Sequence, residues 1–150
     1  MFQTNLFKDK VALVTGGGSG IGFAITQQLL QLGATVVISS RKEERLKAAT
    51  EKLSAFGKVR YAVCDTRETE QIEQLAQSIK STEGKLDILV NNAGGQFPSP
   101  AEDISFKGWN AVINNNLNGT FYVTQTMAKH FFIPNKSGTI VNIIANMFRG

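Results

Sequence analysis

The chain has 150 residues, of which 42% are hydrophobic and 19% charged, and its formal net charge is +4. This length and composition are typical of one globular domain and exclude a disordered, fibrous or collagen-like chain. Lysine and arginine are interspersed with acidic residues, without a long run of like charges, so we expect no nucleic-acid-binding face.

Short apolar runs recur along the chain and predict β-strands. They lie at residues 11–14, 35–38, 59–63, 86–90 and 139–144. Most of these runs are continuously apolar rather than alternating, which is typical of parallel strands buried on both faces by helices.

Amphipathic stretches separate the strands and predict helices, with Ser105 as the N-cap of one of them. These helices are expected at residues 21–32, 43–56, 68–83, 105–114 and 119–132. Apolar residues in 68–83 follow the i, i+3, i+4, i+7 spacing of one buried helix face. Those residues are Ile72, Leu75, Ala76 and Ile79. The alternation of strand and helix predicts an α/β fold with a Rossmann-type doubly wound parallel sheet, comprising the first five strands with flanking helices.

A glycine-rich segment, TGGGSGIG at 15–22, joins the first strand to the first helix. Residues without a Cβ let an anion approach the backbone N–H groups of a helix N-terminus, where the helix dipole favours negative charge. We therefore expect this segment to bind the pyrophosphate of a dinucleotide, the alternative being a turn that only ends the strand. The residues assigned to this binding are Gly16, Ser19, Gly20, Ile21 and Gly22.

The end of the second strand indicates which dinucleotide binds. A carboxylate that contacts the ribose 2′-hydroxyl of NAD usually stands there, whereas this chain has Ser40 and Arg41. A guanidinium and a hydroxyl suit the oxygens of a 2′-phosphate, so we expect NADP(H), with NAD(H) as the alternative. In the other interpretation, Arg41 and Lys42 are solvated residues at the start of a helix.

The glycine spacing T-G-x-x-x-G-x-G resembles that of the short-chain dehydrogenase/reductase family. Further family segments follow in the family's order: N-N-A-G at 91–94, N-L-x-G-x-F at 116–121 and G-x-I-V-N at 138–142. The resemblance implies that residues 1–150 form a dinucleotide-binding Rossmann domain, incomplete at its C-terminus, because the family's catalytic Tyr and Lys follow the fifth strand.

The resemblance also assigns roles to single residues. Asp65, after the third strand, is implied to contact adenine. Asn116 matches an asparagine that takes part in a proton relay and is the implied catalytic residue, with Asn118 as its rival. Ser19 departs from the pattern, since NADP-preferring relatives often have a basic residue in this loop. The residues implied on the ribose and nicotinamide side are Asn92, Ala93 and Gly94.

The chain departs from the family after the fifth strand. Most members present two serines there, the second donating to the substrate carbonyl, but no Ser, Thr or Tyr occurs from Ile140 onward. Loss of such a donor commonly costs a few kcal/mol of transition-state stabilisation. Enoyl-thioester reductases of the family do without the serine, although Asn146 is a conceivable substitute.

A second segment, 91–121, is similar to the peroxisomal trans-2-enoyl-CoA reductases and more loosely to the 2,4-dienoyl-CoA reductases. In it, Phe97 and Trp109 are either acyl contacts or packing residues. The implied function is NADPH-dependent reduction of the conjugated double bond of an acyl-CoA thioester, in a homo-oligomer if the protein is full length.

Two alternatives stay open. One is a 3-oxoacyl or alcohol-type carbonyl oxidoreductase of the same family. The other is a non-catalytic dinucleotide-binding module or a truncated fragment, since the 150-residue chain lacks the Tyr/Lys segment. His130, the only histidine, is expected to be a surface residue rather than a replacement acid.

The N-terminal sequence MFQTNLFKDK has no secretory apolar run, and no apolar stretch approaches the ~20 residues of a membrane span. The single cysteine, Cys64, cannot form an internal disulfide and is expected to be a small buried residue. We therefore expect an intracellular protein, cytoplasmic or peroxisomal, that is not secreted, has no membrane span and holds no metal.

Overall fold

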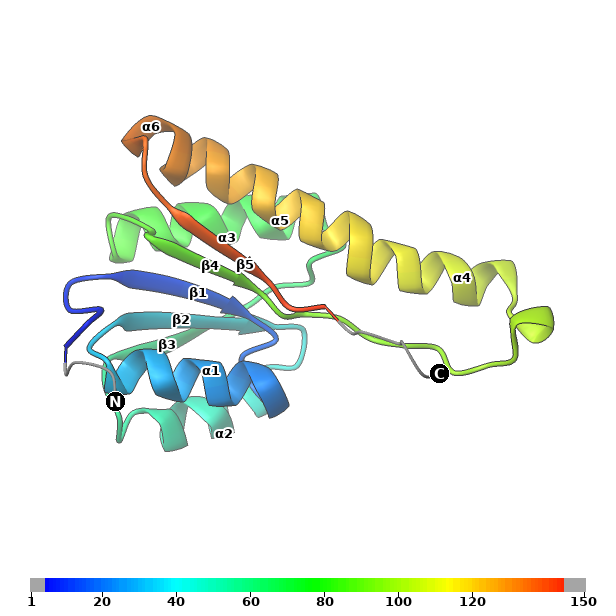
Figure 1. Ribbon diagram of the computed structural model, residues 1–150, viewed down its shortest axis with the longest axis horizontal. Coiled ribbons are helices and arrows are strands. Elements are labelled where there is room, and N and C mark those ends of the chain that lie inside the picture. Colours follow the sequence, from blue (N-terminus) through cyan, green and yellow to red (C-terminus); the bar gives the residue numbers. More distant parts are fainter. Residues whose placement is uncertain (1–4, 145–150) are drawn as a thin grey trace.

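Figure 1 shows the computed structural model of the chain, which describes residues 5–144. Its strands form one parallel five-stranded sheet in the order β3-β2-β1-β4-β5. The strands are β1 (Val11–Thr15), β2 (Thr35–Ser40), β3 (Val59–Val63), β4 (Ile88–Asn91) and β5 (Thr139–Asn142). Because β1 pairs with both β2 and β4, the chain winds away from it in two directions, which confirms the predicted doubly wound sheet.

Helices cover both faces of the sheet (Figure 1). Helices α1 (Gly20–Gln31) and α2 (Glu43–Leu53) lie on one face, and α3 (Thr69–Thr82) and α5 (Gly119–Met127) on the other. Successive residues of β1 alternate between the two hydrophobic cores, so Leu13 packs on the α3 and α5 side. The central strand is therefore buried on both faces, as its continuous apolar run predicts.

Helix α3 is amphipathic in the way its sequence predicts. Its buried residues are Ile72, Leu75, Ala76 and Ile79. They join Val123 and Met127 of α5 in the core on that face of the sheet. The predicted apolar stripe is thus confirmed as the surface that attaches α3 to the sheet and to α5.

One long helical rod replaces the two separate helices expected at 105–114 and 119–132. Its segments are α4 (Phe106–Ile113), a π-helical turn Asn114–Asn118, α5, a second π-helical turn Ala128–Phe132 and α6 (Ile133–Asn135). Ser105 caps it, since its Oγ accepts a hydrogen bond from Gly108 N–H at 3.0 Å. Gly119 does not interrupt the rod: a Cβ there would lie 2.9 Å from Thr66 Oγ1, so glycine permits a close approach to the β3–α3 loop.

The two edge strands differ from the expectation of burial on both faces. Strand β3 is only partly buried, and every residue of β5 is exposed, Ile140 by 40% and Val141 by 42%. Within residues 5–144, β5 has β4 as its one sheet neighbour.

No helix within residues 5–144 combines the length and apolar character that crossing a membrane requires.

Candidate functional site

A pocket lies at the carboxyl ends of β1, β2 and β4, where the strand order reverses about β1. Such a switch point is where open α/β sheets bind ligands. The predicted site residues that line it are Gly16, Ser19, Ser40, Arg41, Asn92, Ala93 and Gly94. Those that do not line it are Gly20, Ile21, Gly22, Asp65 and Asn116.

The glycines of the loop meet different physical requirements. Gly16 and Gly20 have φ of 68° and 54°, a left-handed conformation that residues with a Cβ rarely adopt. A Cβ on Gly22 would lie 2.4 Å from Gly16 O and 2.5 Å from Asn92 Nδ2. Gly22 therefore allows α1 to pack directly against the loop, whereas Gly20 has open space around it.

The N-terminus of α1 faces this loop without a side-chain cap. Ser19 is the N-cap residue, in an extended conformation, and within the described residues its hydroxyl makes no capping hydrogen bond. The first turn contains no acidic residue, and Ile21 is 63% exposed. Backbone N–H groups at this end are thus available to an anion, as a bound pyrophosphate requires.

The end of β2 supplies polar and positively charged groups to the pocket. Ser39 Oγ is buried and has no hydrogen-bond partner among residues 5–144, although Ser39 lines the pocket. Arg41, Lys42 and Arg45 also line it, and in the described part of the chain none of the three takes part in an ion pair. An unpartnered buried hydroxyl beside unpaired cations fits a phosphorylated ribose.

Sequence reasoning missed Arg45, which reaches the pocket from the first turns of α2. A Cβ on Gly18 would lie 3.7 Å from the backbone of Arg45, so α2 begins beside the glycine loop. Arg41 precedes α2, which begins at Glu43, so the spacing of four residues between Arg41 and Arg45 is not a helical one and gave no signal in the sequence.

The N-N-A-G segment ties the loop after β4 to its neighbours. Asn92 Nδ2 donates to Thr15 O at 3.0 Å and to Gly16 O at 3.3 Å. Asn91 Nδ2 donates to Thr124 Oγ1 at 2.8 Å and to Asn142 Oδ1 at 2.9 Å, which joins β4 to α5 and β5. The part that Thr15, Thr124 and Asn142 take in this network was not predicted.

The two rival asparagines of the π-helical turn lie in different surroundings. Asn116 Nδ2 donates to Gly95 O and Val112 O, each at 2.8 Å, and its Oδ1 accepts from Gly95 N–H at 3.1 Å. Among the described residues, Asn118 Nδ2 donates only to Asn114 Oδ1, at 2.8 Å. Of the two asparagines, Asn116 is therefore the one whose side chain holds the loop that follows N-N-A-G. Short π-helical turns within α-helices are frequent at functional sites.

A second cavity lies between β4, β5 and α5, and Asn116 is among the residues that line it. Its other walls are largely apolar and include Leu117, Phe121 and Ile143. The sequence after Ile144, including the proposed substitute Asn146, lies outside the described residues.

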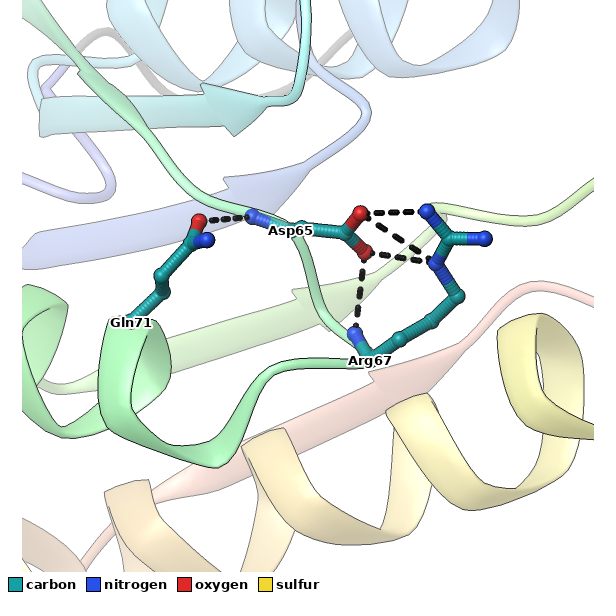
Figure 2. A network of polar contacts seen from close by, with 3 residues as sticks. All are labelled: Asp65, Arg67 and Gln71. Atoms are coloured by element: carbon teal, nitrogen blue, oxygen red, sulfur yellow. Dashed lines mark hydrogen bonds and ion pairs between the residues drawn. The ribbon is translucent and has the colours of Figure 1, made fainter.

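Asp65 lies just outside the first pocket, between two residues that line it, Cys64 and Thr66. Figure 2 shows its carboxylate in contact with the guanidinium of Arg67. The hydrogen bond from Arg67 outweighs partial burial and lowers the pKa of Asp65, with smaller contributions from the positive charges of Arg67 and Arg41. Asp65 is therefore ionised at neutral pH.

Cys64 and His130 are not reactive groups of the pocket. Burial, with a smaller contribution from the charge of Asp65, raises the pKa of the Cys64 thiol to about 11, so it stays protonated at neutral pH. Cys64 is buried, as predicted. His130 is half-buried, does not line the pocket, and its Nε2 contacts Glu73 Oε1 at 2.8 Å.

Phe97 and Trp109 do not belong to the core, since they are 52% and 56% exposed. A Cβ on Gly108 would lie 3.0 Å from the ring of Phe97, so this ring lies against the start of α4. Phe97 is thus a loop residue that packs on a helix while leaving half its surface free.

A doubly wound parallel sheet with a glycine loop at its switch point defines a Rossmann-type α/β protein. Residues 10–147 match the family described as short chain dehydrogenase. The chain belongs to the short-chain dehydrogenase family, as its sequence motifs predicted.

Several curated relatives are more than a third identical to the chain over the aligned residues. It is 37% identical over 153 residues to a peroxisomal 2,4-dienoyl-CoA reductase of Danio rerio, covering 100% of this chain and 51% of that protein. It is 39% identical over 133 residues to a gluconate 5-dehydrogenase of Gluconobacter oxydans, covering 88% and 52%. The chain thus spans about half the length of these relatives.

Solved structures share the fold as well. A citronellol catabolism dehydrogenase of Pseudomonas aeruginosa superposes with a TM-score of 0.93 at 38% identity, covering 100% of this chain and 62% of that one. A metagenomic short-chain oxidoreductase in complex with NADP gives 0.88 at 34% identity, covering 98% and 66%. An NAD+-bound xylitol dehydrogenase gives 0.88 at 31% identity, covering 91% and 53%.

Proposed function

We propose that the chain is the dinucleotide-binding part of an NADPH-dependent enoyl-thioester reductase. The observation that carries the cofactor assignment is the end of β2, where Ser40, Arg41 and Arg45 meet in one pocket with the unpartnered hydroxyl of Ser39. No carboxylate lines this pocket within residues 5–144, so nothing in its described walls repels a 2′-phosphate.

Each part of the dinucleotide then has residues that hold it. The pyrophosphate lies against the N–H groups of the glycine loop and the start of α1. Ser40 and Arg41 bind the 2′-phosphate, and Asp65 contacts the adenine. The pyrophosphate residues are Gly16, Ser19, Gly20, Ile21 and Gly22, and those of the ribose and nicotinamide side are Asn92, Ala93 and Gly94.

The cofactor, when bound, supplies a hydride to the β-carbon of a conjugated thioester. The described residues orient the reactants rather than carry out the chemistry. Asn116 fixes the loop at Gly95 through hydrogen bonds to both its N–H and its carbonyl oxygen. Asn116 also lines the cavity between β4, β5 and α5, and there it is one member of a proton relay.

Two observations support a thioester substrate. Reductases of 2,4-dienoyl-CoA are among the relatives that match nearly the whole chain, in Danio rerio and also in Bacillus subtilis. The chain also lacks the serine that most family members have after β5 and that donates to the substrate carbonyl. Reduction of a double bond does not need this donor. The similarity to gluconate 5-dehydrogenase favours a second candidate, a carbonyl oxidoreductase of the same family.

The cofactor assignment is tested by titrating the 150-residue chain with NADPH and with NADH and following nicotinamide fluorescence. We expect NADPH to bind more tightly. Arg41→Asp should weaken NADPH by at least about tenfold more than NADH, since it replaces a phosphate ligand with a repelling charge. Equal losses for the two dinucleotides would refute the choice of NADP(H).

The substrate assignment is tested on the full-length protein, with NADPH oxidation measured in the presence of crotonyl-CoA or of a 3-oxoacyl-CoA. Faster oxidation with crotonyl-CoA supports double-bond reduction, and faster oxidation with the 3-oxo compound supports the second candidate. Binding of NADPH without oxidation by either substrate would indicate a dinucleotide-binding module without catalysis.

A further inference from the structure

Arg67 holds the carboxylate of Asp65 in a fork (Figure 2). Its Nε donates to Oδ1 at 2.9 Å, its Nη2 donates to Oδ2 at 2.5 Å, and its backbone N–H donates to Oδ1 at 3.1 Å. Gln71 Oε1 accepts from the backbone N–H of Asp65 at 2.8 Å. The carboxylate is therefore fixed by Arg67, in the segment that joins β3 to α3, while Gln71 of α3 holds the backbone of Asp65.

This ion pair lies beside the end of β2. In the parallel register Ser40 is opposite Val63, and Cys64 N–H donates to Ser40 O at 3.0 Å. Continuing this register places Arg41 level with Cys64, one residue before Asp65, and neighbouring strands are ~4.8 Å apart. Besides the larger effect of Arg67, the positive charge of Arg41 contributes to the lowered pKa of Asp65, which agrees with this proximity.

An unpaired carboxylate at this place would act against a phosphate on the adenosine ribose. It would repel the phosphate directly and would also attract Arg41 away from it. Pairing with Arg67 cancels most of the negative charge, because a bidentate fork places the two opposite charges side by side. The pair is partly exposed, so the effect is moderate and weakens as salt is added.

We propose that Arg67 is a positioning residue that determines the specificity for the phosphorylated dinucleotide: by neutralising Asp65, it leaves Arg41 and Ser40 free to bind the 2′-phosphate. The inference rests on the proposed function, since it requires a dinucleotide at this edge of the sheet. It adds a residue that does not line the dinucleotide pocket but sets the charge beside it.

The test compares the NADPH and NADH affinities of variants of the 150-residue chain by fluorescence titration. Arg67→Gln should lower the ratio of NADPH to NADH affinity by about fivefold, since Asp65 then keeps its full charge. Arg67→Lys should leave the ratio within about twofold of the wild-type value, because lysine restores the charge without the fork. Adding Asp65→Asn to Arg67→Gln should bring the ratio back as well.

A purely structural role predicts a different pattern. A loosened β3–α3 loop weakens the binding of both dinucleotides equally, since both contain the same adenine. An unchanged ratio of NADPH to NADH affinity in Arg67→Gln therefore overturns this inference but not the proposed function. Asp65→Asn by itself, which removes the charge rather than exposing it, should keep or raise the ratio, and a lowered ratio overturns the inference as well. If the wild-type chain binds neither dinucleotide, both the proposed function and the inference about Arg67 are refuted.

Discussion

Asn92 donates two hydrogen bonds to Thr15, from its backbone N–H to Oγ1 and from its side-chain amide to the carbonyl oxygen, each at 3.0 Å. Thr15 Oγ1 also accepts the N–H of Ala93 at 3.0 Å. One buried hydroxyl at the end of β1 thus satisfies two backbone donors of the loop after β4. The two loops that line the pocket are held together by a residue that faces the interior.

Thr15→Val should destabilise the protein, because it keeps the shape of the side chain but leaves two partly buried N–H groups, those of Asn92 and Ala93, without an acceptor. Each such loss costs about 1–3 kcal/mol, so we expect about 2 kcal/mol or more in urea unfolding. Thr15→Ser is the matched control, since it retains the hydroxyl. Equal stability of the two variants would show that these hydrogen bonds contribute nothing.

Gly22→Ala should push α1 away from the glycine loop, since its Cβ would lie 2.4 Å from Gly16 O. We expect a loss of about 1–3 kcal/mol in unfolding free energy, together with weaker binding of both dinucleotides. Gly18→Ala serves as the stability control, because the nearest atom to its Cβ would lie at an ordinary 3.6 Å. A Gly22→Ala protein as stable as the control would contradict this account of the packing.

Asn116→Ala should release the loop at Gly95, because Asn116 makes the hydrogen bonds between that loop and the π-helical turn. We expect about fivefold weaker NADPH binding, equivalent to one lost hydrogen bond, and faster proteolysis near Gly95. Asn118→Ala removes only a contact within the turn and should change neither measurement. A larger effect of Asn118→Ala would reverse the choice between the two asparagines.

Asp87 should make stability depend on pH. Burial favours its neutral form, but the N–H of Val11 and the ammonium groups of Lys10 and Lys85 outweigh burial and lower the pKa below its ordinary 3.8. A lowered folded-state pKa gives stability that is present above pH 3.8 and is lost as pH falls through the folded value. Asp87→Asn should therefore be less stable than wild type at pH 7, with a smaller difference at pH 3, in urea unfolding at both pH values. A difference that does not shrink on acidification would argue against this role.

The sequence predicted the sheet and most helices because their apolar residues follow simple spacings, as in α3. It did not predict the continuous rod, because glycine and several asparagines near 114–119 have low helix propensity. Tertiary packing prevails there, since Gly119 gains a close approach to Thr66. The exposure of β5 was also missed, because an apolar run does not reveal whether its strand lies at an edge of the sheet that residues 5–144 form.

Residues that a local pattern marks, at the glycine loop and the end of β2, could be proposed for the site from the sequence, and several of them line the first pocket. The roles of Thr15 and Arg67 were not predicted, for different reasons. Thr15 acts through partners more than seventy positions away, a relationship that local spacing does not encode. Arg67 acts on the charge of its neighbour Asp65, and an arginine two positions from an acid has no distinctive pattern.

The central place of β1 has a consequence for biosynthesis. Its partner on one side, β2, is synthesised almost at once, whereas its partner on the other, β4, begins at Ile88. Until that residue leaves the ribosome, one edge of an apolar strand offers its N–H and carbonyl groups to any other extended chain. Between translation of β2 and of β4, the nascent chain therefore presents one unpaired edge of β1 to misassembly.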